Sequence, residues 1–288
     1  MKKDGLAISG VRERMTTTSI IVHIALIIMA IIVIAPLVLP FCFAFKTPLE
    51  FAYHPWSFPK EFKWENFVIA WNSVKIGQGM FNTFIICLGA VATTVPSAAM
   101  AGYIFSRYKS KLTNILFYAV MAGFFVPAQM VLIPLYRLNL KLNLIDTYPG
   151  IFLALATFGI PFWTMIYRSF YNTLPNDLME AARIDGATDW GIFFKVMLPL
   201  TKSATILAVL LTFMGAWSDY MISLVLINSQ DLFTMQLRVA QFIGNLGANF
   251  FPQYAAGCII SAAPTITLYI IFRKKIIEGT TLAGALKG

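Results

Sequence analysis

Residues 20–44 read IIVHIALIIMAIIVIAPLVLPFCFA, and no charged side chain interrupts this run. A helix needs about 20 mostly apolar residues to cross the hydrocarbon core of a bilayer. The run is longer than the apolar part of a signal peptide, which has about 7–15 residues, and we find no obvious small-residue cleavage site. We therefore interpret it as a retained membrane span.

The composition of the whole chain agrees with a membrane protein. Of the 288 residues, 58% are hydrophobic and 12% are charged, whereas an ordinary soluble domain has about 25% charged residues. The net charge is +9, but the chain has no polar domain on which a nucleic-acid-binding surface could form, so we expect no nucleic-acid partner. Lys and Arg residues at the ends of membrane spans, which are surrounded by membrane lipid, explain the positive charge more simply.

Five further apolar runs of similar character follow the first. They are Met80–Ser106, Leu112–Tyr136, Thr147–Tyr167, Ser203–Asn228 and Tyr254–Phe272. Barrel strands would alternate in polarity, whereas these runs are continuous. The sequence therefore predicts an all-α integral membrane protein with six transmembrane helices in residues 20–272, an N-terminal segment 1–19 and a C-terminal tail 273–288.

The distribution of basic residues predicts the orientation. The side that would hold both termini and the 168–202 connection carries 15 Lys and Arg, against seven on the other side. Cytoplasmic loops carry the excess of basic residues in membrane proteins. We therefore expect a multi-pass protein of the cell membrane with both termini in the cytoplasm.

Prolines and glycines interrupt most of the predicted spans. They are Pro36, Pro40, Pro96, Pro127, Pro134, Gly159, Pro161 and Pro264. They indicate either simple packing kinks or a bundle whose helices bend between two states. The second span also carries small residues that would permit close helix approach: Gly89, Ala90, Ala98, Ala99 and Gly102.

The connection between the fourth and fifth spans, residues 168–202, is too long for a simple turn. Pro175 suits a first helical turn, and Gly186 is placed to end that helix in a left-handed conformation. Thr188 can cap a second short helix that Pro199 ends. The apolar side chains expected on one face of the two helices are Leu178, Ala181, Ala182 and Ile184, then Ile192, Phe193, Val196 and Met197. The pattern predicts a helix–turn–helix that either lies on the membrane or docks a soluble partner.

Residues 180–204, EAARIDGATDWGIFFKVMLPLTKSA, carry a specific resemblance. They resemble the EAA signature of importer-type ABC transporter permeases, in the carbohydrate branch of MalG-like subunits with a MetI-like transmembrane domain. Val196 stands where that family commonly has Ile. Other segments resemble the family in the same order: Phe45-Lys46-Thr47 with Glu50, Pro127-Ala128-Gln129, Ile133-Pro134-Leu135, Asp146-Thr147-Tyr148, Trp217-Ser218-Asp219-Tyr220 and the ending Glu278–Gly288.

The resemblance implies a permease subunit that forms half of the translocation pathway for a sugar, such as a di- or oligosaccharide. The implied partners are a second permease subunit, two ATPase subunits that bind ATP and Mg²⁺, and an extracellular or periplasmic solute-binding protein. The residues implied to contact the ATPases are Glu180, Ala181, Ala182, Asp185, Gly186, Leu198 and Pro199 in the connection, and Thr281, Gly284 and Lys287 in the tail. Glycerol phosphate or another small solute is the alternative cargo.

The chain itself lacks the motifs of an enzyme. The phosphate-binding motif GxxxxGK[ST] does not occur. Gly186 and Gly191 have the glycine spacing of that motif, but Ile192 stands where the motif requires Lys. Neither a CxxC pair nor HExxH occurs, so we expect no metal site, no catalytic residue and no cofactor in this chain. An intramembrane enzyme would need a nucleophile with a base, which no predicted span contains.

Asp219 is the one acid inside a predicted span. A charge at mid-membrane costs at least about 2.5–3.5 kcal/mol. It therefore either lines a translocation path together with Trp217 and Tyr220, or caps a helix where the fifth span breaks. A secondary transporter would need further intramembrane acids or paired broken helices for a coupling ion, which argues against that class.

Overall fold

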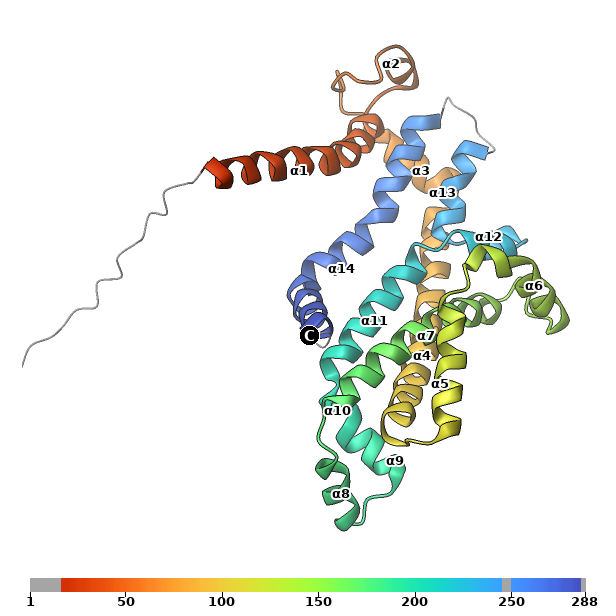
Figure 1. Cartoon of the computed structure of the whole chain (residues 1–288). Helices are drawn as coiled ribbons and strands as arrows, with labels where there is room; N and C mark the ends of the chain where they lie inside the picture. Colours follow the sequence, from red (N-terminus) through yellow and green to blue (C-terminus); the bar gives the residue numbers. More distant parts are fainter. Residues whose placement is uncertain (1–16, 245–249, 286–288) are drawn as a thin grey trace, which may run out of the picture.

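The computed structural model describes the backbone of residues 17–244 and 250–285, and the side chains of residues 19–243 and 250–276. Within these ranges every regular element is a helix. The helices form an elongated bundle with α2 and α3 at one end and α8 and α9 at the other (Figure 1). The predicted segment 1–19 lies almost wholly outside the described residues, as do the side chains of the tail beyond Ile276.

The helices follow one another along the chain without long excursions. Their bounds are α1 Thr17–Ala44, α2 Pro48–Tyr53, α3 Glu65–Ser73, α4 Ile76–Arg107, α5 Lys111–Phe124, α6 Ala128–Lys141, α7 Tyr148–Asn172, α8 Asp177–Ile184, α9 Asp189–Ile192, α10 Leu198–Leu200, α11 Lys202–Trp217, α12 Met221–Leu226, α13 Met235–Gly244 and α14 Phe251–Ala285. A π-helical turn, Phe193–Met197, joins α9 to α10, and a 3₁₀ turn, Gln230–Leu232, precedes α13.

The all-α prediction is confirmed, and the spans can now be counted on the structure. Among the described residues, four helices are long and apolar enough to cross a membrane: α1, α4, α7 and α14. Two bent pairs bring the number to as many as six if each pair is one span. These pairs are α5 with α6, and residues 189–200 with α11.

The third predicted span, Leu112–Tyr136, is not one straight helix. The chain bends by 104° between α5 and α6, and Pro127 stands at the N-cap of α6 in an extended conformation. The reason is local, because a residue before proline is driven out of the helical region. The other predicted helix breakers lie inside helices: Pro36 and Pro40 in α1, Pro96 in α4, Pro134 in α6, Gly159 and Pro161 in α7, and Pro264 in α14.

The fifth predicted span, Ser203–Asn228, is interrupted near Asp219, as one of the two interpretations of that residue expected. Helix α11 ends at Trp217, and the chain turns at Ser218 before the short helix α12 begins. The apolar run therefore contains a long helix and a separate short one, and Asp219 lies at the break between them.

The core of the bundle lies between α4 and α7, where small residues allow close packing. Ala98 and Ala99 are buried. A Cβ atom on Gly102 would lie 2.6 Å from the Cβ of Tyr167 and 2.9 Å from the backbone nitrogen of Arg168, so no larger residue fits without a shift. The predicted close approach of the second span is confirmed.

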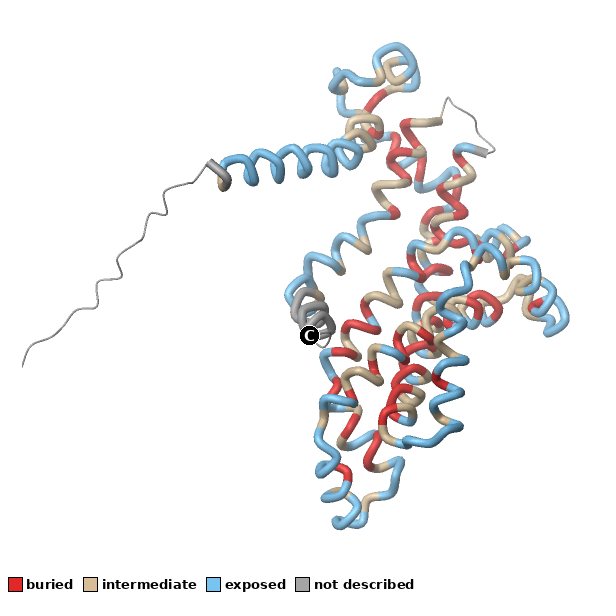
Figure 2. The backbone as a smooth tube through the Cα atoms, viewed as in Figure 1, coloured by how far each residue is buried: buried red, intermediate tan, exposed pale blue. Residues whose placement is uncertain are grey.

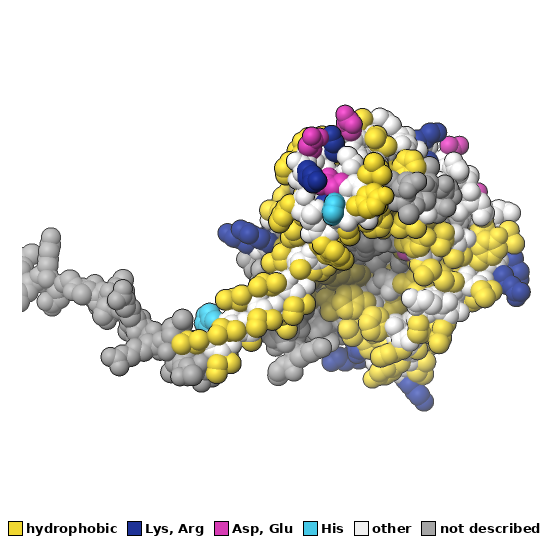
Figure 3. Space-filling view, turned by 90° about the horizontal axis from the view of Figure 1, so that it is seen from above, with side chains coloured by type: hydrophobic (Ala, Val, Ile, Leu, Met, Phe, Trp, Pro, Cys, Tyr) yellow, Lys and Arg dark blue, Asp and Glu magenta, His cyan; other side chains and the backbone are white. Residues whose placement is uncertain are grey.

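Helix α1 contrasts with this core, because it projects away from the bundle (Figure 1). None of its most apolar 18-residue window is buried, as the exposed colouring of Figure 2 shows. Its contacts with the rest of the chain are concentrated on α14, near Phe43 and Ala44. Seen from above, hydrophobic side chains line the projecting helix (Figure 3). Among the residues that the structure describes, none therefore covers the greater part of this apolar helix.

Candidate functional site

The connection between α7 and α11 folds into a helical element, residues 176–200, which we call the α8–α10 element. Helix α8 begins after Asn176 and carries Asp177 and Glu180 in its first turn, where the helix dipole favours acids. Pro175 lies before the helix, so its predicted place in the first turn is wrong.

The end of α8 confirms the predicted role of Gly186. Its φ angle is +80°. Two hydrogen bonds close the turn: the N–H of Gly186 donates to the carbonyl of Arg183 at 3.0 Å, and the N–H of Ala187 donates to that of Ala182 at 2.9 Å. This pair is the Schellman arrangement, which depends on a residue in the left-handed conformation at this position.

The second half of the element begins as predicted and ends later. The Thr188 side chain accepts a hydrogen bond from the N–H of Gly191 at 3.2 Å, which caps α9. Pro199 was expected to end the helix, but α10 continues to Leu200. The π-helical turn explains this continuation. The N–H of Leu198 donates to the carbonyl of Phe193, five residues earlier. In this wider turn the helix continues past Pro199, although Pro199 has no N–H to donate.

Large apolar side chains seat the element on the bundle. Those buried are Met179, Ile192, Phe193 and Met197. They belong to one cluster with side chains of α4, α7 and α11, among them Tyr103, Trp163, Tyr167, Tyr171, Ala204 and Leu207. The predicted apolar face of α8 is divided in the structure. Ala182 packs inward, as does Met179, while Leu178, Ala181 and Ile184 are exposed.

A single arginine ties α4 to the start of the element. The Arg107 guanidinium donates to the carbonyl oxygens of Tyr171 at 2.5 Å and Leu174 at 2.9 Å, and to the side-chain oxygen of Asn176 at 2.5 Å. Sequence reasoning used Arg107 for the orientation alone. Nothing in its local sequence indicates this role, because the acceptors lie more than 60 residues along the chain.

The outward face of the element mixes apolar and acidic side chains. Ile184 is 86% exposed, and the exposed rings of Trp190 and Phe194 stack with their centroids 5.9 Å apart. Arg183 and Asp189 form an ion pair at 3.3 Å, and the hydrogen bond that the Arg183 guanidinium donates to Asp189 raises the pKa of that guanidinium. The spacing of Trp190 and Phe194, one helical turn apart, could have revealed this surface in the sequence.

The predicted contact residues of this element fall into two groups. The exposed ones are Glu180, Ala181, Asp185, Gly186 and Pro199, and the half-buried ones are Ala182 and Leu198. The structure therefore gathers them on one protruding element. The structure describes only the backbone at Thr281 and Gly284, and Lys287 lies entirely outside the described residues, so the three predicted tail contacts cannot be placed.

Asp219 has the hydrogen bonds of a helix cap. Its carboxylate accepts from the backbone N–H of Ile222 at 3.3 Å and of Ser223 at 2.9 Å, and from the Ser223 hydroxyl at 2.8 Å. These bonds begin α12 at the point where α11 has ended. The 16 residues of α11 separate this break from the α8–α10 element by roughly 24 Å.

Trp217 and Tyr220, beside Asp219, differ in their surroundings. The Trp217 indole is buried, stacks on Phe213 with 6.0 Å between ring centroids, and donates to the Ser261 carbonyl of α14 at 3.0 Å. It lines a hollow of about 610 Å³ between α4, α11 and α14, together with Phe84. Tyr220 is exposed.

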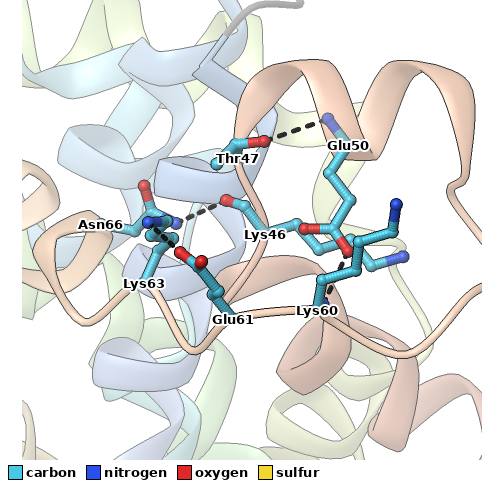
Figure 4. A network of polar contacts seen from close by, with 7 residues as sticks. All are labelled: Lys46, Thr47, Glu50, Lys60, Glu61, Lys63 and Asn66. Carbon is cyan, nitrogen blue, oxygen red and sulfur yellow. Dashed lines mark hydrogen bonds and ion pairs between the residues drawn. The ribbon is translucent and has the colours of Figure 1, made fainter.

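The opposite end of the molecule carries a folded loop, residues 45–64, which we call the Lys46 cap. The Lys46 side chain is fully buried, and its ammonium donates to the carbonyl oxygens of His54 at 2.7 Å and Pro55 at 2.8 Å. The Asn66 amide of α3 donates to the Lys46 carbonyl at 2.8 Å (Figure 4). Thr47 caps α2 by accepting from the N–H of Glu50 at 3.1 Å.

Exposed aromatic side chains cover the Lys46 cap. They are Tyr53, Trp56, Phe58, Phe62 and Trp64. The sequence singled out Lys46 for a resemblance, but its burial could not be foreseen because the acceptors depend on how the loop returns. Within the described residues, no group of three or more His, Cys, Asp or Glu side chains could hold a metal ion.

Residues 94–277 match a family model described as "Binding-protein-dependent transport system inner membrane component". The match covers well over half of the chain, and the chain belongs to that family.

Curated relatives and a solved structure agree with this family. The diacetylchitobiose uptake system permease protein NgcG of Streptomyces coelicolor is 29% identical over 88% of this chain and 84% of its own length. The arabinooligosaccharides transport system permease protein AraQ of Bacillus subtilis is 30% identical over 78% and 80%. A chain from a bacterial ABC transporter involved in the import of the acidic polysaccharide alginate shares the fold, with a TM-score of 0.80, 21% identity and coverage of 89% and 95%.

Proposed function

We propose that this chain is one permease subunit of an ATP-driven importer, and that it forms half of the pathway for a di- or oligosaccharide. The observation that carries the proposal is the α8–α10 element, whose exposed face is fixed to the helix core by buried side chains. The names of the relatives NgcG and AraQ support a carbohydrate cargo.

The α8–α10 element is proposed to dock on a cytoplasmic ATPase subunit. Its outward face offers Ile184 and the Trp190–Phe194 stack to an apolar groove, and Glu180 and Asp185 to basic residues around that groove. Because Met179, Phe193 and Met197 belong to the same cluster as residues of α4, α7 and α11, a displacement of the element moves those helices. ATP and Mg²⁺ are bound by the ATPase subunits, and this chain contributes no nucleotide site.

Helix α1 supports the proposal of a second permease subunit. An apolar helix that its own chain leaves uncovered can be surrounded by lipid or packed on another membrane protein. We propose that part of α1 lies against the second permease. The hollow beside Trp217 would then face the pathway between the two subunits, with Asp219 and Tyr220 following Trp217 in the break between α11 and α12.

The sidedness follows from the excess of basic residues and from the position of the element. Both termini and the α8–α10 element are proposed to lie in the cytoplasm, and the Lys46 cap outside. The exposed aromatic side chains of the cap would meet the solute-binding protein there. The tail, with Thr281, Gly284 and Lys287, is proposed to reach the ATPases, and deletion of Leu282–Gly288 would lower substrate-stimulated ATP hydrolysis while the spans still insert.

The experiment is reconstitution of the whole transporter in liposomes with its binding protein. A panel of di- and oligosaccharides, with glycerol phosphate included, is tested for stimulated ATP hydrolysis and uptake. We expect stimulation by a sugar, uptake that requires ATP, and neither activity from this chain alone. Sugar uptake by the chain alone, or uptake that collapses with the proton gradient, would contradict the proposal. Stimulation by glycerol phosphate and by none of the sugars would change the proposed cargo.

A further inference from the structure

A narrow groove runs beside the α8–α10 element, between the end of α4, the start of α5 and α9. Its volume is about 430 Å³. The side chains that matter here are Met100, Tyr103, Ile104, Tyr108, Trp190 and Phe193, and the wall is almost entirely carbon. The volume and the apolar wall are typical of a site for a small apolar ligand.

The position of the groove restricts what can occupy it. Helix α4 is a candidate membrane span that ends at Arg107. Met100 lies two turns before that end, which is about 10 Å along the helix axis. The groove therefore starts within the apolar part of the membrane and opens at its surface, beside Tyr108. An occupant must be apolar at one end and compatible with water at the other.

One polar group in the wall lacks a partner. Tyr103 is 5% exposed, and its hydroxyl group is buried without any hydrogen-bond partner. A buried hydroxyl that makes no hydrogen bond is unfavourable. By contrast, the Thr113 hydroxyl, also in the wall, already donates to backbone carbonyls. The Tyr103 hydroxyl is therefore available to an oxygen acceptor on a ligand.

The chain segment that borders the groove is basic. From the last residue of α4 to the first residue of α5 it carries Arg107, Lys109 and Lys111 and no acid, and Tyr108 within this segment lines the groove. Lys109 and Lys111 are exposed. The acid in the wall, Asp189, is already paired with Arg183 at 3.3 Å. A basic site between helices at the membrane surface suits an anionic lipid headgroup.

We propose that this groove binds one anionic phospholipid. An acyl chain lies along Met100 and Ile104, the Tyr103 hydroxyl donates to an ester oxygen, and the phosphate lies between Lys109 and Lys111. Because Trp190 and Phe193 form the opposite wall, the lipid fills the space between the membrane helices and the α8–α10 element. Transport coupling therefore depends on anionic lipid. The cytoplasmic location of this site rests on the orientation proposed above.

Lipid retention tests the proposal directly, without ATP or sugar. The whole transporter complex is purified from nanodiscs of phosphatidylcholine with phosphatidylglycerol, and bound lipid is measured by native mass spectrometry. We expect phosphatidylglycerol to be retained on this subunit. The double variant Lys109→Gln with Lys111→Gln should retain it about tenfold or more weakly, given what two lysines contribute near an anionic surface. Tyr103→Phe, which removes one hydroxyl group, should weaken it by a smaller factor.

Two controls separate this site from its alternatives. The variant Lys274→Gln with Lys275→Gln removes the same charge from another exposed basic segment on the proposed cytoplasmic side. It should retain lipid as the wild type does. Equal loss in both double variants, or no retained phosphatidylglycerol in the wild type, would overturn the proposal. A photo-crosslinker at Tyr108 that reacts with an ATPase subunit and not with lipid would also overturn it.

The functional consequence has its own readout. Sugar-stimulated ATP hydrolysis of the wild type should be higher in liposomes with phosphatidylglycerol than in phosphatidylcholine alone, and the Lys109 and Lys111 double variant should lose that difference. A negative result for lipid retention would not contradict ATP-dependent sugar uptake. If the transporter showed no uptake, lipid retention could still be measured. The two proposals are thus tested separately.

Discussion

The two ends of the molecule both present exposed aromatic side chains, but they are held in place by different interactions. The α8–α10 element is seated by buried apolar side chains such as Ile192 and Met197, in a cluster shared with the helix core. The Lys46 cap is organised around a buried ammonium group and is tied to α3 through Asn66. A displacement of the first end is therefore transmitted into α4, α7 and α11. The second end instead rests on α3 through Asn66 and on α14 through the stacked rings of Phe51 and Phe251.

The largest effect is expected at Gly186, where the turn of the α8–α10 element is set. Gly186→Val places a β-branched residue at a φ of +80°, which costs about 1–2 kcal/mol or more in this conformation. The turn should move, so that ATP hydrolysis is uncoupled from sugar uptake or the ATPases fail to assemble. Uptake and ATP hydrolysis by the reconstituted complex measure both outcomes.

Asparagine at the same position is the matched control. A Cβ atom added at Gly186 would meet nothing within 4 Å, so the expected defect comes from the backbone conformation and not from a clash. Gly186→Asn should retain most of the uptake, because asparagine tolerates the left-handed conformation. If the Asn and Val variants are equally inactive, a different property of this position is responsible.

A smaller and more local effect is expected in the Lys46 cap. Lys46→Met keeps the length of the side chain but removes the ammonium that donates to the carbonyl oxygens of His54 and Pro55. The Ser57 hydroxyl still donates to His54, and a hydrogen bond from a charged donor contributes about 1.5–3 kcal/mol. Residues 45–64 should become sensitive to limited proteolysis. Stimulation by the binding protein should fall, while basal ATP hydrolysis persists.

Lys60 provides the control in the same loop, because it is exposed. Lys60→Met removes the same charge and should leave the protease pattern unchanged. Loss of basal ATP hydrolysis in Lys46→Met would contradict the expectation that damage to the cap does not reach the α8–α10 element.

A graded effect is expected at Arg107, which joins α4 to the start of the element. Arg107→Ala removes hydrogen bonds to Tyr171, Leu174 and Asn176, and a bond from a charged donor contributes about 1.5–3 kcal/mol. The ATP hydrolysed for each sugar transported should rise, because α4 no longer follows α8. Arg107→Lys keeps the charge with a single donor group and should give an intermediate ratio. An unchanged ratio in both variants would show that the core cluster alone carries the movement.

The smallest effect is expected for the ion pair between Lys63 and Glu61 on the cap surface, at 2.5 Å. The hydrogen bond to Lys63 lowers the pKa of the Glu61 carboxyl, so any stabilisation is present above the ordinary pKa and is lost as the pH falls through the lowered one. Exposed pairs of this kind are screened by salt. Lys63→Gln should leave the thermal unfolding midpoint and the protease pattern unchanged, and a clear shift in either would show that the pair has a structural role.

Local signals made the α8–α10 element predictable from the sequence. Gly186 and Thr188 act on the residues next to them, so their roles as helix end and helix cap could be foreseen and are confirmed. The break at Pro127 had a local signal too, but the continuous apolar run concealed it. Hydropathy reports where a chain prefers lipid and does not report where a helix turns.

Long-range contacts could not be predicted in the same way. Arg107 finds its acceptors far along the chain, and the burial of Lys46 depends on the path of its loop. Asp219 shows the intermediate case, since an acid in an apolar run predicted either a pathway residue or a cap. The hydrogen bonds of Asp219 are those of a cap, and they depend on α12 being a separate helix, which the apolar run did not reveal.

The most direct test of the account is crosslinking from the two ends of the assembled transporter. A photo-crosslinking residue replaces Ile184, which is 86% exposed on the α8–α10 element, or Leu49, which is 72% exposed on the Lys46 cap. We expect Ile184 to crosslink to an ATPase subunit and Leu49 to crosslink to the solute-binding protein. Crosslinks from Ile184 to lipid alone would mean that the element lies on the membrane, and would contradict the central claim that it docks the ATPase.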